Sequence, residues 1–261
     1  MQGILRKMAV TPGEPVEYAM RVGDETIALN PIVEKTISLS FTGEIICIGC
    51  GRKTRKSFAQ GYCYPCFQDA PDCAPCIIRP ELCQAHEGIG RDMEWERKHH
   101  LQEHIVYLSH TGTVKVGVTR STNVPARWID QGATMAMVIA KTPNRYESGL
   151  LEVACKEHIT DRTNWRKMLQ GDSATEDELE AERVRILPVV AHSPYILPKA
   201  EVIRITYPVI TYPENVKSLG FDKQREISGT LMGIKGQYLM FEGDEVLNIR
   251  KHQGYCVDIA I

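Results

Sequence analysis

Four short ligand pairs constrain the fold of this chain more than any other feature of its sequence. Two residues separate the members of each pair, and the pairs are Cys47 with Cys50, Cys63 with Cys66, Cys73 with Cys76, and Cys83 with His86. A turn of this length places both side chains on one side of a backbone knuckle, where they can share a tetrahedral ion. Four pairs therefore predict two metal sites with four ligands each.

Zinc is the metal we expect at both sites. Seven of the nine cysteines lie between Cys47 and Cys83. The chain begins without the apolar stretch of a secretory signal, and no apolar run approaches the roughly 18 residues of a membrane span. We therefore expect a cytoplasmic protein without a membrane segment, in which thiols stay reduced and free to bind metal. The alternatives are unligated buried cysteines and an iron–sulfur cluster.

The pairing of the ligands stays open at this point. A sequential pairing joins the first pair to the second and the third to the fourth, and an interleaved pairing joins the first to the third. Either arrangement gives closed, four-ligand sites, which favours two structural Zn²⁺ ions over catalytic ones. The region has few large apolar side chains, so metal binding, worth about 10 to 16 kcal/mol in small zinc modules, is expected to fold it.

A basic loop follows the first pair. It contains Arg52, Lys53, Arg55 and Lys56 beside Phe58. Such a loop can contact the phosphates of nucleic acid, and a solvated charged loop is the alternative. The whole chain has a net charge of −2, so attraction to nucleic acid must come from local patches of this kind.

The central segment predicts a β-β-α-β-α order. Two β-branched runs, 105–108 and 114–119, flank a glycine-containing turn and indicate a hairpin. A short helix over 123–131, a strand over 134–141 and a helix that begins near Asn144 complete the order.

This segment resembles the GIY-YIG nuclease superfamily over about residues 105–159. Ile105-Val106-Tyr107 stands at the first motif and Lys115-Val116-Gly117 at the second, followed by Thr119, Arg127 and Glu152. The resemblance implies that Arg127 contacts the scissile phosphate, that Glu152 holds Mg²⁺ or Mn²⁺, and that Tyr107 helps to place or activate the water.

Lys115 departs from the superfamily pattern, because it stands where the second motif has a tyrosine. A phage-associated branch of the superfamily also has lysine there, so the expected fold is kept while catalysis is put in question. Each residue also has a structural alternative: Tyr107 as a core aromatic, Arg127 paired with a carboxylate, and Glu152 as a solvated helix residue.

A second resemblance spans nearly the whole chain. The ligand pairs, the run Arg127-Trp128-Ile129-Asp130-Gln131-Gly132-Ala133 and the later Gly-Ile-Lys-Gly-Gln-Tyr at 233–238 resemble an uncharacterised bacterial and archaeal zinc-cluster family, domain-of-unknown-function family 2797. This family carries no established activity. His100 with His104 and Cys155 with His158 form further pairs, which we interpret as structural or surface residues.

The two ends of the chain predict strands that pair with each other. We expect an α+β fold in which residues 1–44 join a β domain within residues 173–261, as a small barrel or sandwich. The expected strands near the C-terminus include 202–207 and 209–212, and an acidic helix with a capping box is expected from Thr175 to Pro188. A zinc-ribbon-like insertion at 45–90 and the GIY-YIG-like module at 91–172 complete the predicted domains.

Three functions are compatible with these features. The first is a divalent-metal-dependent endonuclease acting on DNA or RNA at Tyr107, Lys115, Arg127 and Glu152. The second is a non-catalytic module that binds structured RNA or DNA. The third is a scaffold whose zinc modules bind another protein. The sequence lacks a phosphate-binding P-loop and a serine-hydrolase elbow, so nucleotide hydrolysis and serine chemistry are disfavoured.

Overall fold

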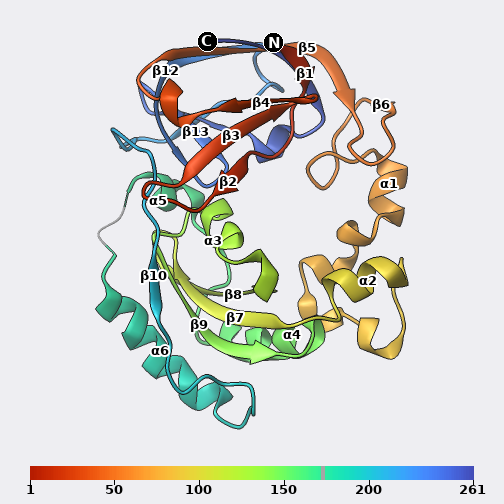
Figure 1. The fold of residues 1–261 in the computed structure, drawn as a ribbon, viewed down its shortest axis with the longest axis vertical. Coiled ribbons are helices and arrows are strands. Elements are labelled where there is room, and N and C mark those ends of the chain that lie inside the picture. The colour runs from red at the N-terminus through yellow and green to blue at the C-terminus, as the bar shows by residue number, and fades with distance from the viewer. Residues whose placement is uncertain (172–173) are drawn as a thin grey trace. The chain divides into compact units, whose positions relative to one another are not determined.

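The computed structural model describes residues 1–171 and 174–261, which fold into two units with separate sheets (Figure 1). The first unit comprises residues 1–68, 169–171 and 206–261, and the second comprises the rest of the chain. No helix within the described ranges is long and apolar enough to cross a membrane. The protein is therefore a mixed α+β protein whose two ends fold together.

An eight-stranded sheet forms the main layer of the first unit. Its hydrogen-bonded order is β1-β15-β5-β12-β13-β14-β11, and β6 pairs with β5 outside this path. The strands are β1 (Gln2–Ile4), β5 (Thr36–Ile46), β6 (Lys53–Thr54), β11 (Lys217–Ser218), β12 (Glu226–Lys235), β13 (Tyr238–Phe241), β14 (Glu245–Asn248) and β15 (Tyr255–Ala260).

Strands from the two ends of the chain pair within this sheet, as the sequence predicts. β5 is hydrogen-bonded to β12 on one side and to β15 on the other, and β1 pairs with β15. Residues 242–244 join β13 to β14, and Gly243 and Asp244 in this short connection have positive φ angles of 81° and 70°, which glycine and aspartate tolerate in hairpin turns. The N-terminal strands thus acquire the partners that they need in order to bury a face.

The barrel that the sequence analysis allowed does not form. The sheet stays open among the described residues, because its two ends, β1 and β11, are only three and two residues long and do not pair with each other. A second sheet of the same unit contains β2 (Ala9–Thr11), β3 (Glu17–Val22) and β4 (Glu25–Ala28). The unit is therefore built from two open sheets.

The second unit has a four-stranded sheet with helices. The sheet order is β10-β9-β7-β8, and all its pairings are antiparallel. The elements are α2 (Met93–His99), β7 (His104–His110), β8 (Val114–Arg120), α3 (Ala126–Asp130), β9 (Met135–Thr142), α4 (Arg145–Lys156), α6 (Glu176–Val190) and β10 (Val202–Arg204). Two short helices complete the chain, α1 (Tyr64–Asp69) and α5 (Trp165–Leu169).

The central segment has the β-β-α-β-α order that its sequence predicts, in β7, β8, α3, β9 and α4. Asn144 caps α4 by accepting a hydrogen bond from the backbone N–H of Glu147. A core of Val106, Leu108, Val116 and Leu151 lies between the strands and α4. β-branched residues on the strands and a polar cap before the helix explain why the order could be predicted.

The acidic helix α6 begins as predicted but ends later. Thr175 and Glu178 form the expected capping box. Pro188 lies inside the helix, which continues to Val190, so the proline marks the last turn. The helix packs against the rest of the second unit through buried residues that include Leu179 and Ile186.

Two predicted strands differ from the structure. Residues 209–212 make only an isolated bridge, between Val209 and Gly233, because prolines at 208 and 213 flank them and supply no N–H to a ladder. The other strand, β10, pairs with β9 in the second unit, so the boundary predicted at residue 173 does not match the boundary between the units.

The predicted zinc insertion is also divided between the two units, at residue 68. The reason lies in the contacts of its second half. The guanidinium of Arg145 on α4 donates hydrogen bonds of 3.0 and 2.8 Å to the carbonyl of Cys76. Gly149 of α4 approaches the backbone so closely that an added Cβ would lie 2.3 Å from the nitrogen of Glu81. These contacts join the second half to the second unit.

Candidate functional site

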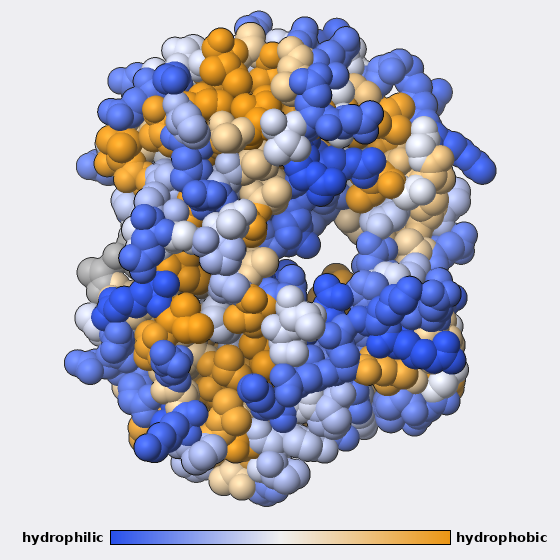
Figure 2. Space-filling model, in the orientation of Figure 1, coloured by the Kyte–Doolittle hydropathy of each residue, from blue (hydrophilic) through white to orange (hydrophobic). Residues whose placement is uncertain are grey.

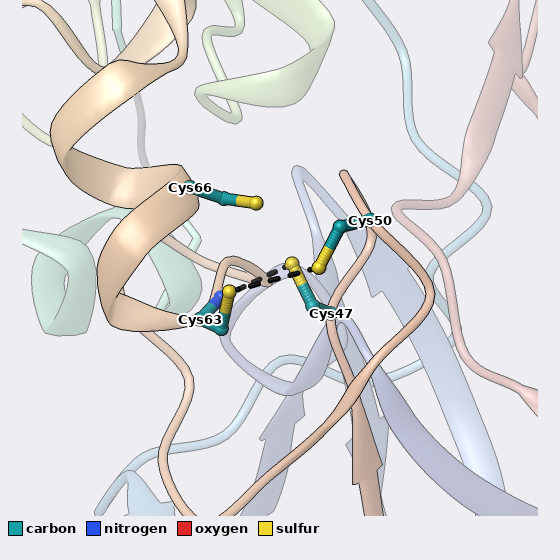
Figure 3. A group of neighbouring side chains, drawn as sticks. All are labelled: Cys47, Cys50, Cys63 and Cys66. Atoms are coloured by element: carbon teal, nitrogen blue, oxygen red, sulfur yellow. Dashed lines mark hydrogen bonds between the residues drawn. The ribbon is translucent and has the colours of Figure 1, made fainter.

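Four cysteines of the first unit converge on one point (Figure 3). Cys47 follows β5, Cys50 lies in the turn after it, Cys63 precedes α1, and Cys66 lies in α1. Their four sulfur atoms lie within 4.8 Å of one another. The sequential pairing holds for this group, because Cys73 and Cys76 are not part of it.

Local backbone geometry creates the knuckle. Gly51 has a φ of 72°, a conformation that side chains other than glycine rarely adopt, and its N–H donates a 2.9 Å hydrogen bond to the carbonyl of Cys47. The Sγ atoms of Cys50 and Cys63 lie 3.7 Å apart. Zn–S bonds of about 2.3 Å at tetrahedral angles would place two sulfurs about 3.8 Å apart. The group is therefore able to bind a zinc ion.

Backbone N–H groups favour a thiolate at Cys47. Burial tends to raise the pKa of this thiol, but hydrogen bonds from the backbone of Cys63, Cys50 and Gly49 outweigh it and lower the pKa to about 6. The N–H of Cys63 lies 3.1 Å from the Cys47 sulfur. Hydrogen bonds with Cys50 and Cys63 raise the pKa of Cys66 to about 12. A metal ion bound here would displace the thiol proton of Cys66 and would bind the Cys47 thiolate directly.

A second group lies in the other unit and contains Cys76, Cys83 and His100. All three side chains are buried, and the Cys83 sulfur lies 3.6 Å from Nδ1 of His100. Zinc with one sulfur and one nitrogen ligand would separate these atoms by about 3.5 Å. The hydrogen bond from Cys76 lowers the pKa of Cys83 to about 4, which makes Cys83 the thiolate of the pair. This group is also able to bind metal.

The membership of the second group differs from the predicted set. Cys73 and His86 do not belong to the group, and His100, expected to be structural or on the surface, does. The imidazole of His86 instead stacks on Tyr146, with ring centroids 4.4 Å apart. Spacing rules find ligands two residues apart, whereas His100 lies 17 residues after Cys83, across a helix.

The sequence signal for His100 lies in α2. Glu96 and His100 are four residues apart, so they share one face of the helix, and both are only 2% exposed. A carboxylate oxygen of Glu96 contacts Nδ1 of His100. The opposite face carries exposed Glu94, Arg97 and Lys98, and Figure 2 shows that the surface around α2 is mainly hydrophilic. A buried Glu-x-x-x-His pair on a charged helix was the available clue.

Replacing His100 by Ala should remove the metal ion of the second group, whereas His86→Ala should leave it bound. The reason is that His100 lies within ligand distance of the two thiols. Metal content per chain, measured by plasma mass spectrometry on both purified variants, checks this. If His86→Ala lost the ion and His100→Ala kept it, His86 would be the ligand, as the sequence predicts, and His100 would not.

A cluster of ionisable groups lies in the same unit as the second metal group. It contains the four residues predicted as catalytic: Tyr107 on β7, Lys115 on β8, Arg127 on α3 and Glu152 on α4. Tyr107 pairs with Gly117 across the two strands, and an added Cβ at Gly117 would lie 2.7 Å from the Tyr107 hydroxyl. Lys115 lies two residues from Gly117 and so faces the same side of the sheet.

Electrostatic interactions connect these four residues. Burial raises the pKa of the Tyr107 phenol, and the charge and hydrogen bond of Arg127 oppose this rise. Burial and the positive charge of Arg127 lower the pKa of Lys115 to about 7, although Glu152 acts in the opposite direction. Among the described residues, the Lys115 amine has no hydrogen-bond or ion-pair partner, and its residue is 3% exposed. A buried lysine of this kind is neutral in a large fraction of molecules at pH 7.

Glu152 forms an ion pair with Lys156. Burial raises the pKa of its carboxyl, and Lys156 opposes the rise. The Lys156 ammonium lies 3.2 Å from an oxygen of Glu152 and 3.0 Å from one of Asp161. Two carboxylates therefore meet around one cation in this cluster.

The basic loop lies in the first unit, and all four of its cationic side chains are exposed. Lys53 pairs with Glu44, and Lys56 lies over the ring of Phe58 at 5.2 Å from its centroid. Arg52 and Arg55 have no ion-pair partner among the described residues. Two of the four cations are thus fully available to an anionic ligand.

Fold and site together define an α+β protein with two sulfur-rich groups able to bind metal ions such as zinc. The family model of DUF2797, a protein of unknown function, matches residues 34–257. The chain therefore belongs to the DUF2797 family. No match was found among curated proteins or among solved structures.

Proposed function

We propose that this protein binds DNA or RNA and hydrolyses a phosphodiester bond at the cluster of Tyr107, Lys115, Arg127 and Glu152. The observation that carries the proposal is that these residues, which the GIY-YIG resemblance selects, come from four separate elements and interact electrostatically in the fold. Ionisable groups whose pKa values are shifted by burial and by neighbouring charges, as for Lys115, are frequent at catalytic sites. The two sulfur-rich groups have a structural role in this proposal.

Lys115 has the properties of a general base. An amine with a pKa of about 7 can accept a proton from the attacking water near neutral pH. Arg127 would contact the scissile phosphate, where its charge offsets the negative charge that builds up on the phosphoryl oxygens. The Tyr107 hydroxyl donates a 2.9 Å hydrogen bond to Gln131, which fixes its orientation toward the cluster.

A divalent ion fits the donors of this cluster. Mg²⁺ and Mn²⁺ prefer carboxylate oxygens, and Glu152 and Asp161 provide two that already share the Lys156 ammonium. These two residues would hold the ion, which would neutralise charge on the phosphate. Lys156 would have to leave the space between them.

Nucleic-acid binding would also use the basic loop of the first unit. Arg52, Lys53, Arg55 and Lys56 can neutralise backbone phosphates, so binding should weaken as salt is raised. Each removed phosphate contact should reduce the slope of log affinity against log salt by about one.

The proposal is tested by cleavage assays on Glu152→Ala with labelled DNA and RNA in the presence of Mg²⁺ or Mn²⁺. Cleavage should fall by at least about a hundredfold while binding persists, because the variant loses a metal ligand and keeps the basic loop. The matched control is Glu157→Ala, which removes an exposed carboxylate just after the same helix. The proposal fails if the unmodified protein cuts neither DNA nor RNA with either metal ion.

One observation favours a second candidate, a non-catalytic nucleic-acid-binding module. Lys156 already forms ion pairs with both Glu152 and Asp161, so each carboxylate has a cationic partner without a divalent ion. In that case the protein would bind nucleic acid with the same salt dependence and cut none. The same assays separate the two candidates.

A further inference from the structure

A pocket of the first unit lies between β5, β6 and the loop before β12. Its volume is about 660 Å³. Six of its lining residues matter for recognition: Phe41, Lys53, Arg55, Phe221, Asp222 and Tyr255. None of them belongs to the metal groups or to the ionisable cluster of the second unit.

Three aromatic rings form one wall of this pocket. The Phe41 ring centroid lies 5.0 Å from that of Tyr255 and 5.9 Å from that of Phe221. Phe221 and Tyr255 are almost fully buried, while Phe41 is half-buried, so Phe41 presents the most accessible ring. A half-open wall of rings can stack the flat face of a heterocycle.

Charged groups at the rim decide which ligand fits. Lys53, which also pairs with Glu44, and Arg55, which has no ion-pair partner among the described residues, line the pocket, and Arg52 and Lys56 lie next to them in the sequence. Asp222 adds a carboxylate to the described lining, where it accepts a 2.8 Å hydrogen bond from the Tyr255 hydroxyl and lies 3.7 Å from the Lys251 ammonium. An aromatic wall with a carboxylate also suits a methylated ammonium ligand. The positive charges of Lys53 and Arg55 in the lining would repel such a positively charged ligand.

We propose that this pocket binds one unpaired base of single-stranded nucleic acid, with the base stacked on Phe41 and the adjoining phosphates at Lys53 and Arg55. Asp222 offers a hydrogen-bond acceptor to an amino group of the base. The inference rests on the nucleic-acid binding of the proposed function and adds to it a preference for single strands. It does not depend on catalysis.

The test measures fluorescence anisotropy of a labelled single-stranded oligonucleotide and of its duplex with the full-length protein. Phe41→Leu should lower the affinity for the single strand about tenfold, since base–aromatic stacking is strong and leucine keeps the apolar packing. Duplex affinity should change little. Phe241→Leu is the matched control, because Phe241 is buried on β13 of the same unit and lies outside the pocket lining and the basic loop. Unchanged metal content will show that both variants are folded.

A second arm uses oligonucleotides in which one nucleotide at a time is abasic. One position should lose about as much affinity as Phe41→Leu does, and the variant should lose nothing more on that oligonucleotide. Arg55→Gln should reduce the salt dependence of binding, whereas Arg21→Gln, which removes an exposed charge from β3 of the same unit, should not.

The proposal is overturned if Phe41→Leu and the abasic series leave single-strand binding unchanged, or if a trimethyllysine peptide competes for the pocket. If the pocket fails while Glu152-dependent cleavage is found, the proposed function stands without it. If binding depends on Phe41 and no cleavage is found, the pocket stands and catalysis fails.

Discussion

Replacing Cys47 by Ser is expected to remove one zinc ion per chain and to unfold residues 47–68 while both main sheets persist. Backbone hydrogen bonds lower the pKa of the Cys47 thiol to about 6, and the Cys47 sulfur is the one that the N–H of Cys63 contacts. Its loss leaves three ligands in a segment whose α1 helix buries no residue. Zinc contributes about 10 to 16 kcal/mol to the folding of small modules, far more than this segment can recover by apolar burial.

The measurement combines metal content with limited proteolysis. The variant should lose one of two zinc ions and gain cleavage sites within residues 47–68. Cys256→Ser is the matched control, because Cys256 lies half-buried on β15 of the same unit and outside the metal groups. Retention of both ions by Cys47→Ser, or equal loss in both variants, would contradict a four-cysteine zinc site.

The first metal group could be predicted because its chemistry is local. Two knuckles with two intervening residues each already fix both sulfurs of a pair on one side. Only the meeting of the two pairs needs the fold, in which the N–H of Cys63 contacts the Cys47 sulfur and the N–H of Ile48 donates to the carbonyl of Gly61. Short-range geometry therefore determined most of this group.

The membership of the second group could not be predicted from ligand spacing alone. His100 reaches Cys76 and Cys83 because α2 turns its buried face, with Glu96 and His100, toward them. That contact depends on tertiary packing, which no spacing rule contains. The same holds for the open sheet of the first unit, because the pairing of short end strands depends on neighbours far apart in the sequence.

The ionisable cluster could be predicted in part from the sequence. The strand pairing that places Tyr107 over Gly117 follows from a hairpin, which sequence patterns predict well. Lys115 was expected at the site as a departure from the superfamily's tyrosine. Its burial and the nearby charge of Arg127 on α3, which together lower its pKa to about 7, required the fold. The contact of Lys156 with Glu152 and Asp161 likewise depends on the fold, because Asp161 lies beyond the end of α4.

Lys115→Met should reduce phosphodiester cleavage by about a hundredfold to ten-thousandfold, the usual contribution of a general base. Methionine has a similar length and no charge, so it replaces a buried, largely neutral amine with little change in packing. The matched control is Lys141→Met, since Lys141 is exposed on β9 of the same sheet. A Lys115→Met variant with full activity would exclude this residue as the base.

The pH dependence gives an independent test of the same residue. Below a pKa of about 7 the Lys115 amine is protonated and cannot accept a proton, so the rate should rise as pH increases through about 7 and then level off. Lys115→Met should lose this rise.

The stability of the fold should depend on the same residue. In the unfolded chain the Lys115 amine stays protonated up to about pH 10.5, whereas in the fold it loses its proton near pH 7. Lys115 therefore makes the free energy of unfolding increase from about pH 7 toward 10.5. Denaturant unfolding should show this increase in the unmodified protein and in Lys141→Met. The Lys115→Met variant should not show the increase. That result would place a neutral Lys115 amine in the folded core even if no substrate were cut.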